Sequence, residues 1–103
     1  TACSNDFSFN SIFSRNLEAI GCKEDILIVI STSGNSKNIL NVLKTAKKKK
    51  IFCIGFLGNK GGNAKKLCDL NLTIDSSDTA RIQECHIFLG HYIFQEVEKS
   101  FLK

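Results

Sequence analysis

The sequence predicts an α/β fold in which a parallel β-sheet, built from strand–helix–strand units, is sandwiched by helices. Three apolar segments of strand length, residues 25–31, 51–57 and 70–74, alternate with segments of helical periodicity. The first two are almost continuously apolar, which is typical of strands buried on both faces of a parallel sheet. Strands that alternate with helices favour right-handed parallel crossovers. With 103 residues and no linker or internal repeat, residues 1–103 are expected to form one domain.

The first twenty residues lead into this pattern. Residues 1–4 resemble the tail of a strand and residues 5–8 a polar loop. Two origins stay open, a processed small protein or the second part of a longer one, and the order of elements favours the second. A helix is predicted over residues 10–20, followed by Gly21 in the C′ position that commonly ends a helix. Its apolar side chains recur with helical spacing: Phe13, Leu17 and Ile20.

After the first strand, a helix is predicted over residues 36–49, because its apolar side chains form one stripe. That stripe consists of Ile39, Val42, Leu43 and Ala46. The second strand follows, and a glycine-rich turn is expected at residues 58–62. A short helix is predicted over residues 63–68. The strand of residues 70–74 alternates between apolar and polar side chains, which is typical of a position near a sheet edge.

A loop and helix cap at residues 76–79 precede a long helix predicted over residues 79–102. One face of this helix is apolar: Ile82, Cys85, Leu89, Ile93, Val97 and Phe101. Further apolar side chains extend around most of its circumference: Ile87, Phe88, Tyr92, Phe94 and Leu102. Such a helix needs more than one sheet to cover it. We therefore expect an oligomer, a missing N-terminal helical part, or both.

Charge and hydropathy exclude some partners. The formal net charge is +4, and a run of four lysines at residues 47–50 accounts for it. Cations at a helix C-terminus complement the helix dipole and stay solvated. The alternative is a nucleic-acid-binding patch, but such a patch typically contains interleaved aromatic residues or more arginines than Arg15 and Arg81. No apolar run approaches the ~20 residues of a membrane span, and no secretory signal precedes the fold, so a cytoplasmic protein without nucleic-acid or membrane partners is expected.

Five cysteines are present, and their spacing argues against a cysteine-based site. They are widely spaced and contain no C-x-x-C pair: Cys3, Cys22, Cys53, Cys68 and Cys85. This pattern favours small buried hydrophobic residues in a reducing compartment over a disulfide framework or a zinc knuckle.

The segment after the first strand carries the clearest functional signal. It consists of Ser31, Thr32, Ser33, Gly34, Asn35 and Ser36, and a helix begins directly after it. Hydroxyl donors beside the unsatisfied amides of a helix N-terminus can hold an anion, usually a phosphate. Gly34 permits a sharp turn or a close approach to a ligand. The loop has no lysine, so it is not a Walker-type P-loop, and it suits a sugar phosphate. The alternative is that Ser36 is an ordinary N-cap and the rest a polar turn.

Four motifs resemble the sugar isomerase (SIS) domain family and, within it, the bacterial phosphoheptose isomerases. They are Asn5-Asp6-Phe7, residues 13–19 (FSRNLEA), residues 31–36 (STSGNS) and residues 78–84 (DTARIQE). The resemblance spans the whole chain with the motifs in step. It implies a flavodoxin-like parallel topology and a cytoplasmic homotetramer. It also implies an aldose–ketose isomerase that converts sedoheptulose 7-phosphate to D-glycero-D-manno-heptose 7-phosphate, which supplies heptose for lipopolysaccharide or capsule.

The same resemblance implies roles for individual residues. Ser31, Thr32, Ser33 and Ser36 match the family's phosphate-binding positions. Asn5 and Asp6 match the pair that contacts the sugar. Gln83 and His91 match positions near the reacting carbons that also ligate zinc in some members. Simpler roles stay open: Gln83 as an interface residue, and Asn5 and Asp6 as parts of a turn.

The family's N-terminal half is absent from the sequence, including a substrate loop, a metal-binding histidine and the glutamate taken as catalytic base. Isomerisation through an enediol needs a base on the carbon acid and a second group that shuttles the oxygen protons. Histidine suits the second task, because its unperturbed pKa lies near neutrality. His91 is therefore the acid/base candidate. His86 is expected to be structural, and Arg81 is expected to pair with Asp78.

Helix geometry limits any metal site. Gln83 and His91 are eight residues apart, which is about 12 Å along a helix and roughly 80° around it. They could converge on one zinc ion only with extended side chains, and two more ligands would have to come from outside this chain.

Three function classes remain at this point. The first is the isomerase. The second is a non-catalytic SIS protein that binds a replication initiator or another protein partner, and the third is a phosphosugar-sensing module without turnover. The Asn5-Asp6-Phe7 motif favours the isomerase.

Overall fold

The computed structural model describes residues 9–102 and confirms the predicted α/β fold. Its elements are η1 (Phe9–Ser11), α2 (Ile12–Ile20), β1 (Ile26–Ser31), α3 (Lys37–Lys49), β2 (Phe52–Gly58), α4 (Ala64–Leu67), β3 (Leu70–Ile74) and α5 (Thr79–Phe101). The described strands form a parallel sheet in the order β1-β2-β3. Residues 1–8, with the predicted strand tail and loop, lie outside the described residues. No helix between residues 9 and 102 combines the length and the apolar character needed to cross a lipid bilayer.

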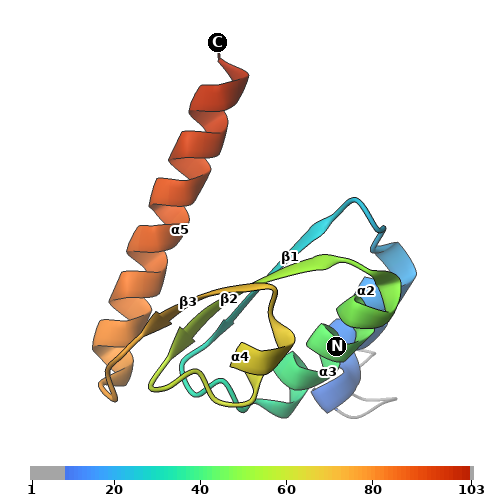
Figure 1. Ribbon diagram of the computed structural model, residues 1–103, viewed down its shortest axis with the longest axis horizontal. Helices are drawn as coiled ribbons and strands as arrows, with labels where there is room; N and C mark the ends of the chain where they lie inside the picture. Colours follow the sequence, from blue (N-terminus) through green and yellow to red (C-terminus); the bar gives the residue numbers. More distant parts are fainter. Residues whose placement is uncertain (1–8, 103) are drawn as a thin grey trace.

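The two faces of the sheet are covered to different extents (Figure 1). Helices α2, α3 and α4 gather on one side, whereas α5 begins near the ends of the strands and runs away from the sheet toward the C-terminus. The core lies under the first group of helices. Its fully buried members include Leu43, Ala46, Leu57 and Ala64.

The expectation that β1 is buried on both faces is wrong for the described residues. Val29 is 3% exposed, but Ile26 and Ile30 on the opposite face are 62% and 57% exposed. Side chains alternate between the two faces of a strand, so this contrast means that the α5 side of β1 is uncovered. The cause is that α5 packs chiefly against β2 and leaves the sheet before it crosses β1.

Helix α2 ends at Ile20 as predicted, but its start and the conformation of the glycine after it differ from the prediction. A short 3₁₀ turn occupies residues 9–11, and the α-helix begins at Ile12. Gly21 has an extended backbone with φ −76°, not the left-handed conformation of a C′ glycine. Glycine is needed there for space, because a Cβ would lie 2.7 Å from the Leu17 carbonyl oxygen. The Gly21 amide donates to the Leu17 carbonyl oxygen at 2.7 Å. Lys49 Nζ also satisfies the end of α2, since it donates to the carbonyl oxygens of Leu17 (3.3 Å) and Glu18 (2.7 Å).

The described cysteines form no disulfide and, apart from Cys85 on α5, lie away from the carboxyl ends of the strands. Cys53 is buried, as predicted, whereas Cys22 is exposed. Burial, with smaller contributions from Asp69 and Cys68, raises the pKa of Cys53 to about 11. Burial, followed by Asp69, also raises the pKa of Cys68. Both groups are therefore neutral thiols near pH 7, which fits a packing role.

Candidate functional site

Three loops meet at the carboxyl ends of the parallel strands, where open α/β sheets bind their ligands. We call residues 31–36 the serine loop, residues 58–62 the glycine turn and residues 75–78 the entry loop of α5. Each follows or includes the last residue of one strand, so the parallel pairing brings them to the same edge.

The serine loop is folded by its own hydroxyl groups. Ser31 is only 6% exposed, and its Oγ accepts a hydrogen bond from the amide of Gly34 at 3.0 Å. Ser33 Oγ accepts from the amide of Asn35 at 3.1 Å, and Ser36 Oγ lies 3.4 Å from Ser31 Oγ. Ser33 and Ser36 are exposed, and Thr32 is half-buried. The buried Ser31 thus shapes the turn, while its exposed neighbours keep hydroxyl groups available to a ligand.

The glycine turn and the two residues that follow it, Asn63 and Ala64, brace the serine loop. The amide of Ala64 donates to the Gly34 carbonyl oxygen, and the amide of Asn63 donates to Asn35 Oδ1, both at 2.8 Å. Gly34 has φ +71°, and a Cβ there would collide with the carbonyl oxygen of Gly61. The serine loop therefore requires glycine at position 34 for both its backbone conformation and its close packing.

Asn59 ties all three loops together, and sequence reasoning missed it. Its side-chain Nδ2 donates to the Thr32 carbonyl oxygen, and its backbone amide donates to the Ser76 carbonyl oxygen, both at 2.9 Å. Its φ of +54° is a conformation that asparagine tolerates better than most residues. An asparagine within a glycine-rich turn is the sequence signal for this positive φ, but its two hydrogen-bond partners depend on the tertiary structure.

The N-terminus of α3 opens beside the serine loop. Ser36 occupies the N-cap position but makes no side-chain capping hydrogen bond. The first turn of α3 holds no acidic residue and begins with the exposed cation Lys37. A cation at a helix N-terminus is unfavourable toward the helix dipole, whereas an anion is stabilised there. This end of α3 is thus electrostatically suited to an anion, and Lys37 is a second feature that the sequence prediction left out.

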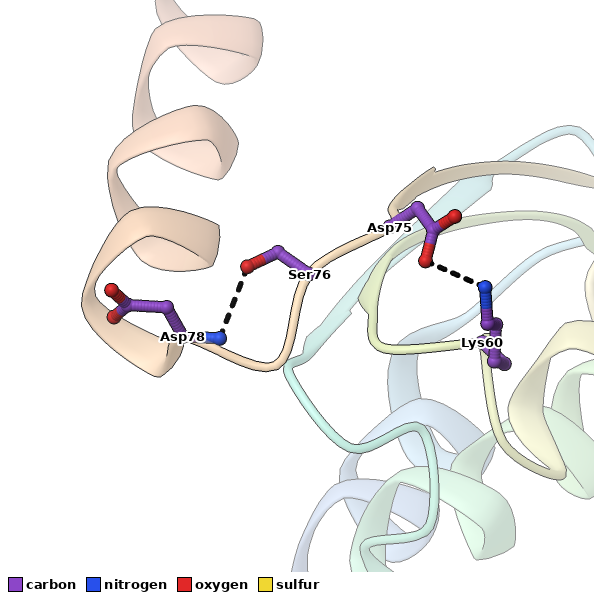
Figure 2. A network of polar contacts seen from close by, with 4 residues as sticks. All are labelled: Lys60, Asp75, Ser76 and Asp78. Atoms are coloured by element: carbon purple, nitrogen blue, oxygen red, sulfur yellow. Dashed lines mark hydrogen bonds and ion pairs between the residues drawn. The ribbon is translucent and has the colours of Figure 1, made fainter.

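The entry loop of α5 is fastened by polar contacts, which Figure 2 shows. Lys60 of the glycine turn pairs with Asp75 at 2.8 Å, and the amide of Asp78 donates to Ser76 Oγ at 3.0 Å. Asp78 is the N-cap of α5 and accepts from the amide of Arg81. The predicted Arg81–Asp78 ion pair is wrong, because the Arg81 side chain turns along the helix and pairs with Glu84 at 2.7 Å.

A groove of about 600 Å³ lies between α5 and the uncovered face of the sheet. Ile28, Ile30 and Phe56 contribute its sheet side. On α5, Gln83, His86 and His91 line it. The structure therefore brings the two predicted helix residues Gln83 and His91 to one groove, and both are exposed there. Ile30 precedes Ser31, so the groove begins at the foot of the serine loop.

His86 differs from His91 in burial and bonding. It is 3% exposed, its Nε2 lies 2.8 Å from the Leu57 carbonyl oxygen, and its ring packs against Phe56 with centroids 5.9 Å apart. These contacts agree with the structural role predicted for it. Its Nδ1, however, has no hydrogen-bond partner.

The donors present fit only part of a zinc site. Within residues 9–102, no cluster of three or more His, Cys, Asp or Glu side chains could hold a metal ion. Gln83 and His91 could supply two ligands from the groove, but zinc takes four. The two predicted sugar-contacting residues, Asn5 and Asp6, lie in the segment that the structure does not describe.

Sequence comparison identifies the family. The SIS domain matches residues 3–88 of this chain. The chain belongs to the SIS domain family. The serine loop and half of the groove-lining residues of α5, among them Gln83 and His86, fall inside the matched SIS region, whereas His91 lies just beyond it.

Individual SIS relatives are named phosphoheptose isomerases. The chain is 52% identical over 101 residues to the phosphoheptose isomerase of Campylobacter concisus, covering 98% of this chain and 53% of that protein. It is 50% identical over 101 residues to phosphoheptose isomerase 1 of Campylobacter jejuni, covering 98% and 54%. The chain thus spans about half the length of these curated relatives.

Solved SIS structures agree with the described fold. The phosphoheptose isomerase from Neisseria gonorrhoeae superposes with a TM-score of 0.86 at 38% identity, covering 88% of this chain and 52% of that one. The Francisella tularensis enzyme superposes with a TM-score of 0.84 at 35% identity, covering 87% and 49%. The predicted parallel SIS fold is therefore confirmed.

Proposed function

We propose that this chain is the sugar-phosphate-binding part of a phosphoheptose isomerase, which converts sedoheptulose 7-phosphate to D-glycero-D-manno-heptose 7-phosphate. The observation that carries the proposal is the juxtaposition of a braced, hydroxyl-rich loop with a groove lined by Gln83 and His91. The similarity to named phosphoheptose isomerases over nearly the whole chain supports it.

In this proposal the phosphate binds at the serine loop. Ser33 and Ser36 are exposed and would donate hydroxyl hydrogens to the phosphate oxygens, together with the first amides of α3. Thr32 is half-buried and would contribute from the side. Ser31 would act mainly by holding the turn, because its hydroxyl already accepts from Gly34. Asn5 and Asp6 are proposed to contact the sugar.

The reacting end of the sugar would lie in the groove beside His91. In the reaction, a base removes a proton from C1 of the ketose to form an enediol and returns a proton to C2. At the same time a proton passes from the C1 hydroxyl to the C2 oxygen. His91 is exposed in the groove and is proposed to move these oxygen protons. The carbon base is proposed to come from the family's other half.

Zinc, assembly and location are finer parts of the same proposal. Gln83 and His91 are proposed as two zinc ligands, the others coming from outside residues 9–102; zinc would polarise the substrate carbonyl. A homotetramer is proposed because α5 exposes several large apolar side chains, among them Phe88 at 68% and Phe101 at 82%. A cytoplasmic location and a role in heptose supply for lipopolysaccharide or capsule are proposed with them.

Turnover in the full-length protein tests the proposal. Sedoheptulose 7-phosphate is added, the aldose product is followed by NMR, and calorimetry measures binding of the same compound. We expect both binding and conversion. Binding without conversion would favour a sensing module, and absence of both would contradict the proposed function.

A further inference from the structure

His86 is one of two residues that anchor the long helix α5. Only Ile82 and His86 are buried among the 23 residues of α5. Ile82 packs closely on Gly58: a Cβ added to Gly58 would lie 2.7 Å from Cδ1 of Ile82. His86 bonds to the neighbouring Leu57 carbonyl oxygen at 2.8 Å. These two contacts fix the rotation of α5 over the end of β2, and with it the direction in which Gln83 and His91 face.

The bond to Leu57 also determines where the proton of His86 resides. A carbonyl oxygen can only accept, so Nε2 must carry the hydrogen. In the neutral ring, Nδ1 is then an unprotonated acceptor. Nδ1 is the single buried side-chain nitrogen or oxygen in the described part of the chain that has no partner. Buried acceptors are rarely left unpaired in native proteins, so this atom calls for a donor.

Gln83 is the donor best placed to reach it. It lies one helical turn before His86, and residues three apart are neighbours on a helix surface. Long side chains on a helix lean toward its N-terminus, which brings the His86 ring over the turn that holds Gln83. Both residues line the same groove, and the Gln83 carboxamide makes no hydrogen bond in this structure. A solvent molecule is a poorer candidate for this donor, because Nδ1 is not accessible to solvent.

We propose that His86 is a positioning residue whose Nδ1 accepts a hydrogen bond from the Gln83 carboxamide in the complete protein. With its NH2 group held, Gln83 presents only its Oε1 to the groove. A side chain that could either donate or accept becomes a fixed acceptor for a substrate hydroxyl or a cation. The catalytic consequence rests on the proposed isomerase function, but the hydrogen bond itself does not.

NMR of the ¹⁵N-labelled full-length protein tests the bond without any substrate. We expect a scalar coupling across the hydrogen bond between Gln83 Nε2 and His86 Nδ1. Gln83→Glu should abolish it, because a carboxylate cannot donate. The matched control is Gln95→Glu, an exposed glutamine of α5 outside the groove, which should leave the coupling intact. Absence of the coupling in the folded wild-type protein would overturn the inference.

Kinetics separate positioning from simple support of the fold. His86→Gln retains a donor for the Leu57 carbonyl but has no nitrogen at the Nδ1 position, whereas His86→Phe retains only bulk. We expect His86→Gln to melt close to wild type yet lose about tenfold or more in kcat. If its kcat equals that of wild type, the positioning role is wrong. If wild type itself shows no turnover, the proposed function fails, and the NMR coupling still decides the present inference.

Discussion

The serine loop and the α5 groove lie next to each other but differ in completeness. In the serine loop, hydrogen bonds from Gly34, Asn59 and Ala64 hold the backbone, and every donor comes from this chain. In the groove, Ile30 and Phe94 are 57% and 62% exposed, and a buried histidine nitrogen lacks a partner. The candidate anion-binding loop is therefore fully formed within the described residues, whereas the candidate reaction site needs further atoms to enclose a substrate.

The largest effect is expected in the groove, where a substitution should lower turnover without weakening substrate binding at the serine loop. In the full-length protein, His91→Ala should lower kcat by about 10²–10⁴, the usual contribution of a general acid or base. Affinity for sedoheptulose 7-phosphate, measured by calorimetry, should stay within severalfold, because the serine loop is untouched. Retained turnover would remove His91 from the mechanism.

Breaking the serine loop should have the next largest effect. Gly34→Ala forces a side chain into a left-handed backbone and onto Gly61, so we expect a loss of about 2–4 kcal/mol in the free energy of unfolding and no phosphate-ester binding. Gly90→Ala is the matched control in the groove. A Cβ at Gly90 would meet Phe56 at 3.9 Å, an ordinary contact, and alanine should stabilise the helix by about 0.5–1 kcal/mol. Denaturant titration measures both.

Removing the exposed hydroxyls tests the loop without unfolding it. The double variant Ser33→Ala/Ser36→Ala should weaken sugar-phosphate binding about 10–100-fold, since hydrogen bonds to a charged group are lost. The melting temperature should change little. Ser100→Ala, at the far end of α5, is the control. Unchanged calorimetric affinity in the double variant would place the phosphate elsewhere.

A smaller effect is expected at the bracing residue. Asn59→Gly keeps the positive φ and the amide but loses the bond to Thr32, so KM should rise about threefold with kcat nearly unchanged. Asn59→Ala should cost about 1 kcal/mol more in stability than Asn59→Gly, because alanine disfavours that backbone. A fall in kcat at constant KM would mean that Asn59 acts on the groove instead of the serine loop.

The smallest effect is expected at the Lys60–Asp75 ion pair. The two side chains are 86% and 74% exposed, so water screens their attraction. Lys60→Ala and Asp75→Ala should show a coupling of about 0.5 kcal/mol or less in a double-mutant cycle. A larger coupling would show that this pair, rather than Asn59, holds the glycine turn to the entry loop.

Local patterns predicted the elements well, because burial of one face imposes a period that can be read along the chain. The stripe of α3 is buried as expected at Ile39, Val42, Leu43 and Ala46. The predicted start and end of the helix over residues 79–102 agree with α5 to within one residue. The same patterns wrongly predicted that β1 is buried on both faces. A continuous apolar run indicates that both faces of a strand need to be covered, but it does not show whether the covering residues lie within the described part of the chain.

Short contiguous stretches of the chain predicted the order of strands and helices along it, the hydroxyl-rich loop and the SIS resemblance. Three other features depend on the fold: Asn59 joins three loops, Arg81 pairs with Glu84, and His86 is buried while His91 lines an open groove. Local patterns could not predict these features, because hydrogen-bond partners and side-chain burial depend on which segments meet in space. For this chain that is set by the parallel pairing of its strands and the rotation of α5 on β2.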